Sequence, residues 1–336
     1  MPCPSVNIHL KSTFPAPSSL LPSIFHHYRF PAVMRTRMMR MTSWLRFTHA
    51  STEFPYESLA TLGDTLVKSY CEGLRQRFQK RTKLANAHEE WFFRTHVAVK
   101  LILSSTVMLS SARYAVKKGL RMVEPYLSYY ALLNTSRALV LMIPEQEWRD
   151  GELFEATHQK VRNVAADQLR CVSTEKATEY RDLVQRALLS RELFSYRFPA
   201  EGLKGDIARS LPDFDQTVSM CRYIGEVAQL HSECLEAAFS SLGRPMGDFS
   251  EDALRGVFEY ESQHLGRLLH DSDDYQRLGS ALVKVGRPVS LSLTATEGLV
   301  EDFFGAWDFS EDALEGEDED RYVPHTNEWD LIFPFH

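Results

Sequence analysis

The stretch YLSYYALLNTSRALVLM, residues 126–142, decides the fold because it is apolar around almost its whole circumference if it is helical. A helix of that kind is buried on most sides. It nevertheless carries Asn134 and Arg137, one turn apart, and a buried guanidinium needs partners. Either Arg137 pairs with a carboxylate such as Glu192 or Glu179, or it belongs to a ligand site, or it faces solvent or an interface.

Helical periodicity continues on both sides of this stretch. Apolar residues recur at spacings of three and four, and prolines and glycines such as Pro144, Pro199 and Gly202 separate the periodic segments. The predicted helices cover residues 58–83, 87–119, 126–143, 155–169 and 174–196. The pattern predicts an all-α bundle over residues 46–205.

The sequence changes character after residue 205. Residues 213–242 and 250–270 have amphipathic helical patterns, whereas ALVKVGRPVSLSLT (281–294) alternates in polarity around Gly-Arg-Pro, which predicts a short β-hairpin. We expect a smaller, mainly helical accessory domain over 206–300. Residues 301–336 then form an acidic tail that contains EDALEGEDED and ends in WDLIFPFH, an apolar clip that can dock on the body.

The beginning of the chain lacks the signs of a folded element. The first acidic residue is Glu53, and before it stand six prolines and the basic run MRTRMMRM. An acid-free basic start resembles an organellar transit peptide, but the prolines interrupt an amphipathic helix. We expect that the true protein begins near Met41 and that residues 1–45 are a disordered or over-read extension.

Composition indicates a cytoplasmic protein with a large core. The chain has 336 residues, of which 44% are hydrophobic, and its five scattered cysteines form no CxxC motif. Lys100 and Arg137 interrupt the two most apolar segments, so we expect no membrane span. HSEC (231–234) lacks a second pair of ligands, and no cofactor motif occurs, so we expect neither a metal site nor a cofactor.

The net charge of −7 conceals two halves of opposite sign. Residues 201–336 hold 10 Lys and Arg against 28 Asp and Glu, whereas the rest of the chain holds 28 against 17. The basic body could bind nucleic acid or another acidic partner, or the tail could cover the body as an internal mimic of that partner. Simple solvation of both halves is the third interpretation.

Three segments in fixed order resemble the HEPN superfamily of prokaryotic helical bundles: SYYALLNTSRALVLM (128–142), THQKVRNVAADQL (157–169) and ALLSRELFSYRFP (187–199). With the preceding residues, GLRMVEPYLSYYALLNTSRAL is also similar to YaaC-like proteins. The resemblance covers about residues 90–200. It implies a helical bundle, often homodimeric, that engages RNA, a nucleotide or a partner protein from the same operon, in toxin–antitoxin or antiviral defence modules.

The resemblance also implies a place for catalysis. Ribonucleases of this superfamily need no metal and use an arginine followed by a histidine near the end of the last bundle helix, for proton transfer and for stabilising charge on the phosphate. In this chain Arg191 is followed by Tyr196 instead, and a phenol, with an ordinary pKa of about 10, is a poor general base. We therefore expect ribonuclease activity that is lost or unconventional.

The segment THQKVRN provides the polar residues of the predicted site. Thr157 can cap the following helix, whose first backbone N–H groups favour an anion; an ordinary cap with a solvated basic face is the alternative. Tyr126, Tyr129 and Tyr130 could stack on bases, but their helical spacing favours the core. The candidate residues are Arg191, Tyr196 and His158 for catalysis, and Asn134, Arg137, Lys160, Arg162 and Asn163 for phosphate or nucleic-acid binding.

Three functions remain open at this point. The preferred one is an HEPN-like protein that engages RNA or a nucleotide-bearing partner without ordinary ribonuclease chemistry. The second is a non-catalytic, YaaC-like helical interaction protein that binds no nucleic acid. The third is an active ribonuclease in which Arg191 and Tyr196 act with His158.

Overall fold

The computed structural model describes residues 54–84, 87–200, 202, 204, 211–241, 274, 276–278, 285–295, 298–306 and 330–333. These residues belong to one compact unit, Met41–His336. They form helices and turns and contain no strand, which confirms the all-α class. The predicted extension over 1–45, the predicted helix over 250–270 and the acidic run EDALEGEDED lie outside the described residues.

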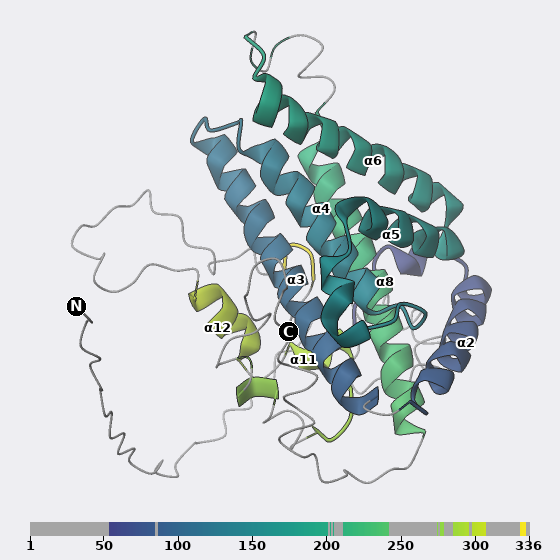
Figure 1. Ribbon diagram of the computed structural model, residues 1–336. Coiled ribbons are helices and arrows are strands. Elements are labelled where there is room, and N and C mark those ends of the chain that lie inside the picture. The colour runs from purple at the N-terminus through teal and green to yellow at the C-terminus, as the bar shows by residue number, and fades with distance from the viewer. Residues whose placement is uncertain are drawn as a thin grey trace, which may run out of the picture. The chain divides into compact units, whose positions relative to one another are not determined.

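Six long helices form the body of this unit (Figure 1). They are α2 (Asp64–Arg81), α3 (Ala87–Lys117), α4 (Glu124–Leu141), α5 (His158–Val172), α6 (Thr174–Glu192) and α8 (Phe214–Ser240). The shorter elements are the 3-10 helices η1 (Leu59–Thr61) and η2 (Arg149–Glu155), the π-helical turn η3 (Leu193–Arg197), and the helices α11 (Leu291–Thr294) and α12 (Leu299–Gly305).

Helix α4, formed by the opening stretch, lies at the centre of the bundle. It packs against α3, α5, α6 and α8, which explains why its sequence is apolar around most of its circumference. Pro125 stands in its first turn, where a missing N–H costs nothing. At its other end the buried Arg94 of α3 donates to the carbonyls of Leu141, Ile143 and Gln146 at 2.7–3.0 Å, at and just beyond the last residue of the helix, where carbonyls lack helical donors.

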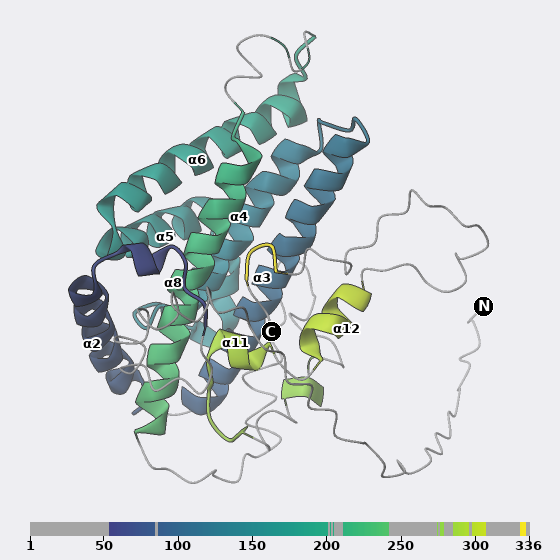
Figure 2. The ribbon, with the colours of Figure 1, turned by 180° about the vertical axis from the view of Figure 1, so that it is seen from behind.

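Helix α8 belongs to the same core. It packs against α2 and α4, and its buried side chains join those helices in one hydrophobic cluster (Figure 2). The predicted boundary at 205/206 therefore separates α8 from helices that share its core. Glu226 extends the connection, because its carboxylate accepts the backbone N–H groups of residues 57–59 at 2.8–3.1 Å and so holds the start of η1.

The described part of the predicted hairpin, residues 285–294, contains the helix α11 and no strand, which corrects that prediction. Side chains of α8 provide the reason. The backbone N–H groups of residues 290–292 donate to them at 2.9–3.0 Å, Ser290 to Glu236, Leu291 to Ser232 and Ser292 to Gln229. These donors are therefore satisfied without a partner strand.

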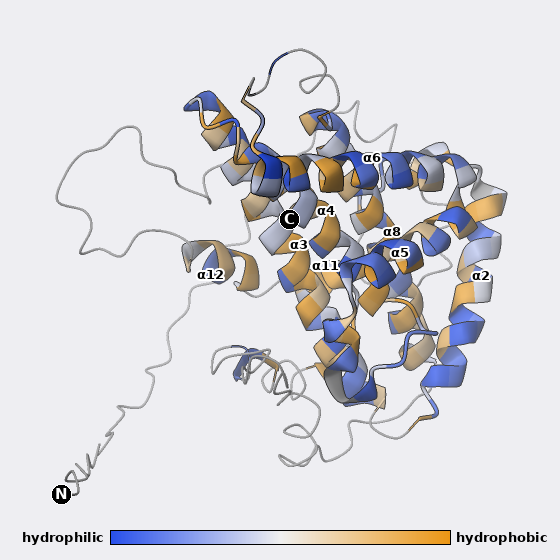
Figure 3. Ribbon diagram, turned by 45° about the horizontal axis from the view of Figure 1, so that its top comes forward, coloured by the Kyte–Doolittle hydropathy of each residue, from blue (hydrophilic) through white to orange (hydrophobic). Residues whose placement is uncertain are grey.

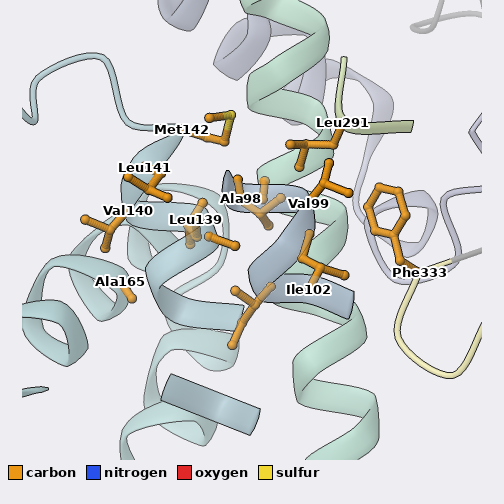
Figure 4. Packing of buried hydrophobic residues seen from close by; sticks show 14 of the residues in the cluster. Ala98, Val99, Ile102, Leu139, Val140, Leu141, Met142, Ala165, Leu291 and Phe333 are labelled. Atoms are coloured by element: carbon orange, nitrogen blue, oxygen red, sulfur yellow. The ribbon is translucent and has the colours of Figure 1, made fainter. Parts of the chain in front are cut away.

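Near its C-terminal end, the chain lies on α8. Residues 331–333, Leu-Ile-Phe, are buried, and Arg222 of α8 donates to the Leu331 carbonyl at 2.6 Å. Ile332 and Phe333 pack against Gly225, where a Cβ would meet both side chains at 3.6 Å. Phe333 also lies with Leu291 beside Val99 and Ile102 of α3 (Figure 4). The described apolar residues of the predicted clip, Leu331, Ile332 and Phe333, are thus part of the core.

Hydropathy follows this arrangement. Hydrophobic residues run along α3 and α4, whereas α2 and α5 carry many hydrophilic ones (Figure 3). Within the described ranges α3 is the one helix long and apolar enough to cross a membrane on length and composition alone, and 72% of its apolar window is buried in the bundle. The core helix of a globular bundle has the same properties.

Candidate functional site

Arg137, the residue that the opening stretch singles out, binds backbone carbonyls. Its Nη1 donates to the Phe154 carbonyl at 2.7 Å and its Nη2 to the Ala156 carbonyl at 3.2 Å. Burial lowers the pKa of Arg137. The predicted carboxylate pairing is wrong, since Arg137 binds neither Glu179 nor Glu192.

The two bonds of Arg137 fix the beginning of α5. Both acceptors lie at the end of η2, immediately before Thr157, whose side chain accepts from the Lys160 backbone N–H at 3.2 Å, as the sequence predicts for a cap. The first residue of the helix is His158. Arg137 therefore positions His158 against α4.

His158 is the centre of a cluster of polar groups from α4, α5 and α6. Its Nδ1 lies 3.1 Å from the phenolic oxygen of Tyr129, a residue that is 1% exposed, and the Tyr130 ring lies 6.0 Å away at right angles. Burial lowers the pKa of His158, and the positive charges of Arg137, Arg191 and Arg162 lower it further. The imidazole is therefore neutral at pH 7.

Arg191 of α6 covers the aromatic side of this cluster. Its guanidinium lies over the Tyr129 ring at 5.0 Å, and its Nη1 donates to the Tyr130 hydroxyl at 3.4 Å. The buried Nε has no hydrogen-bond partner among the described residues. Among the described residues the nearest carboxylate is that of Glu192, which is half-exposed and 3.7 Å away, beyond hydrogen-bonding distance, so it compensates the charge weakly.

Arg162 adds a second guanidinium. Its Nε donates to the backbone carbonyl of His158 at 3.3 Å, one turn earlier in α5, and its terminal nitrogens form no hydrogen bond within the described part of the chain. We call Tyr129, Tyr130, His158, Arg162 and Arg191 the arginine–tyrosine cluster. It combines two guanidinium groups that have unused donors with a neutral imidazole and two aromatic rings.

No other predicted site residue is hydrogen-bonded to this cluster through its side chain within the described part of the chain. Asn134 faces α3, where its amide donates to Ser104 Oγ at 3.3 Å. Lys160 and Asn163 are exposed on α5. Tyr196 is 80% exposed and forms no hydrogen bond with His158. The structure thus brings together three predicted residues, His158, Arg162 and Arg191.

Tyr129 and Tyr130, in contrast, belong to the cluster although their spacing favours the core. Both interpretations hold for Tyr129, because the ring is buried while its hydroxyl reaches His158. The signal that could have identified them is the pair of adjacent tyrosines in the segment that resembles HEPN proteins, because neighbouring helical positions point two hydroxyls toward different partners.

The HSEC segment is part of the core. His231 and Cys234 are fully buried, and the imidazole is held between the Met142 carbonyl, 2.9 Å from Nδ1, and the Tyr70 hydroxyl, 2.6 Å from Nε2. Burial lowers the pKa of His231 to about 3. In the described residues no group of three or more His, Cys, Asp or Glu side chains is arranged to hold a metal ion.

No protein-family model, no curated protein and no solved structure matches this chain. The geometry and charge of the arginine–tyrosine cluster are therefore the features of this chain that bear on its function.

Proposed function

We propose that this chain is an HEPN-like protein that binds phosphate groups of RNA, or of a nucleotide-bearing partner, at the arginine–tyrosine cluster. One observation carries the proposal: Arg162 and Arg191 both lie near His158, the terminal nitrogens of Arg162 have no hydrogen-bond partner among the described residues, and the carboxylate nearest to Arg191 among them is Glu192 at 3.7 Å. Guanidinium groups match the oxygens of a phosphate in charge and in the direction of their N–H groups. The cluster has the chemistry of an anion site.

The arrangement of the helices supports the family part of the proposal. The three segments that resemble HEPN proteins, 128–142, 157–169 and 187–199, lie on α4, α5 and α6, which pack against one another. Each segment contributes at least one side chain to the cluster. Segments of a shared motif that meet at one place in the fold are expected if the motif serves one site.

Binding without ordinary cleavage is the form of the function that we favour. The position after Arg191 where the family has histidine is taken by Tyr196, which lies on η3, is exposed and does not bond to His158. His158 itself stands on α5 and is held through Nδ1 by Tyr129. An HEPN-like protein of this kind would suit a toxin–antitoxin or antiviral defence module in which it recognises RNA. The cytoplasmic location, the homodimer and the partner protein from the same operon stay predictions.

Salt-dependent RNA binding tests the proposal. We expect a fluorescently labelled RNA oligonucleotide to bind the full chain, and Arg162→Ala and Arg191→Ala each to weaken binding and to reduce the slope of log affinity against log salt by about 0.7, the value for one phosphate contact of a single strand. Arg170→Ala is the matched control, because Arg170 also stands on α5 but is exposed and pairs with Asp167 at 3.2 Å.

Two results would contradict the proposal. If no RNA binds at low salt, the interpretation as a YaaC-like interaction protein without nucleic acid gains support. If all three arginine variants weaken binding equally, the attraction is a general effect of net charge and the cluster is not the site.

A further inference from the structure

We infer that the turn at the end of α6 is a stacking platform for unpaired nucleobases, so that the ligand of the arginine–tyrosine cluster is single-stranded RNA. This inference rests on the proposed function and adds the substrate class to it. Its basis is the turn itself, residues 193–198, where the α-helix gives way to one π-helical turn, η3, followed by Phe198.

The backbone of this turn has an unusual form. Phe198 has φ 36° and ψ 73°, a left-handed conformation that bulky side chains rarely adopt. Its N–H donates to the Leu193 carbonyl at 2.8 Å, and the buried Phe194 ring anchors the turn from below. A π-helical turn and a strained aromatic residue at one place are typical of functional positions.

Two aromatic rings of this turn are exposed to solvent. Tyr196 is 80% exposed and Phe198 is 62% exposed, whereas Phe194, in the same turn, is 6% exposed. A single exposed apolar side chain needs no explanation, but here two aromatic residues two positions apart are exposed, and the backbone of one of them is in an unfavourable conformation. Burial of apolar surface within this chain therefore does not explain why these two rings are placed here.

Tyr196 follows Arg191 by five residues and lies near it, and Phe198 follows two residues later in the same turn. The Tyr196 phenol is close enough to the Arg191 guanidinium to interact with it electrostatically. A strand whose phosphates reach Arg191 and Arg162 can therefore place a neighbouring base on Tyr196 or Phe198. Stacking requires a free base face, which single strands offer and duplexes hide inside the helix.

A second copy of this chain is the other occupant to consider for the exposed rings. The same surface carries Arg191 and the exposed Arg197, so a symmetric contact would bring four guanidinium groups together. Unpaired RNA brings negative charge and aromatic surface at once. Charge complementarity therefore favours RNA.

The test compares a labelled single-stranded RNA with the same strand annealed to its complement, using the full chain. We expect Tyr196→Ala and Phe198→Ala each to weaken single-strand binding by about tenfold and to leave duplex binding unchanged. Leu189→Ala is the control, since Leu189 is a 54% exposed apolar residue of α6 before the turn. Phe198→Gly separates folding from binding, because glycine adopts the left-handed conformation without strain. This variant should have a higher melting temperature and still bind the single strand more weakly.

The outcomes distinguish this inference from the proposed function. If Arg191→Ala weakens RNA binding while the Tyr196 and Phe198 variants bind single strands as the unmodified protein does, the platform is absent and the phosphate site stands. If neither RNA form binds, both fail. If the ring variants change the sedimentation coefficient from dimer to monomer without changing RNA affinity, the rings form a self-interface and the inference is overturned.

Discussion

Lowering the pH from 7 to 4.5 should weaken this fold through the buried imidazole of His231. Because the Met142 carbonyl can only accept, Nδ1 of His231 carries the proton that lies on their 2.9 Å bond. Nε2 then accepts from the Tyr70 hydroxyl at 2.6 Å, and Gln168 donates to the Tyr70 oxygen. A second proton would sit on Nε2, which faces the Tyr70 hydroxyl. That hydroxyl is itself the donor in their bond, so the new N–H would have no acceptor.

The size of the effect follows from the pKa. Burial lowers the pKa of His231 to about 3, whereas an unfolded histidine has a pKa of about 6.5. Below pH 6.5 the unfolded chain therefore binds a proton that the folded chain does not, and stability that is complete above pH 6.5 is lost as the pH falls. The slope is about 1.4 kcal/mol per pH unit, which gives about 3 kcal/mol between pH 6.5 and 4.5.

Urea unfolding followed by circular dichroism at half-unit pH steps measures this loss. His231→Gln is the informative variant, because a glutamine amide can still donate to the Met142 carbonyl but does not titrate. The variant should be less stable than the unmodified protein at pH 7. Between pH 6.5 and 4.5 its free energy of unfolding should fall by about 3 kcal/mol less than that of the unmodified protein. Equal pH slopes for both proteins, or an NMR titration of the His231 ring near pH 6.5, would refute the reasoning.

Three further perturbations test other parts of the structure by urea unfolding. Arg137→Met should cost about 2–4 kcal/mol, because two carbonyls lose charged donors, and a loss below about 0.5 kcal/mol would show that these bonds do not hold η2. Glu226→Ala should cost about 3 kcal/mol, because residues 57–59 lose their shared acceptor, and Glu226→Gln should restore part of it. Phe198→Gly should stabilise the fold by about 1 kcal/mol, and a destabilised variant would mean that the left-handed backbone stores no strain.

Much of the helical arrangement could be predicted from local sequence. The helix predicted over 87–119 is Ala87–Lys117, and the one predicted over 213–242 is Phe214–Ser240. Thr157 caps α5 through a bond that its own sequence spacing specifies. Such features depend on residues a few positions apart, so they can be predicted from periodicity and capping rules.

The placement of α8 could not be predicted in the same way. Glu226, His231 and Glu236 are polar residues of kinds that helices usually expose, yet they are buried and bonded to residues 54 to 169 positions away. A polar side chain that meets a distant backbone N–H leaves no periodic signal. The predicted boundary at 205/206 therefore assigned α8 to a second domain, although α8 shares its core with α2 and α4.

The candidate site was predictable in its residue types but only partly in its geometry. The cost of burying Arg137 correctly required partners, but the sequence suggests carboxylates, and the partners are carbonyls of the turn before α5. Carbonyls belong to every residue and carry no sequence signal. Tyr196 falls within the helix predicted over 174–196, but in the structure it lies on the π-helical turn η3 with its ring exposed, a change of helix type that periodicity does not reveal.

The pKa of His158, measured by NMR with and without RNA, tests the central claim most directly. In the free protein we expect a value below 6.5, because burial and the charges of Arg137, Arg191 and Arg162 all disfavour the protonated ring. A phosphate held by the arginines offsets their charge, so saturating single-stranded RNA should raise the pKa. A value at or above 6.5 in the free protein, or no change when RNA is added, would contradict a phosphate site at the arginine–tyrosine cluster.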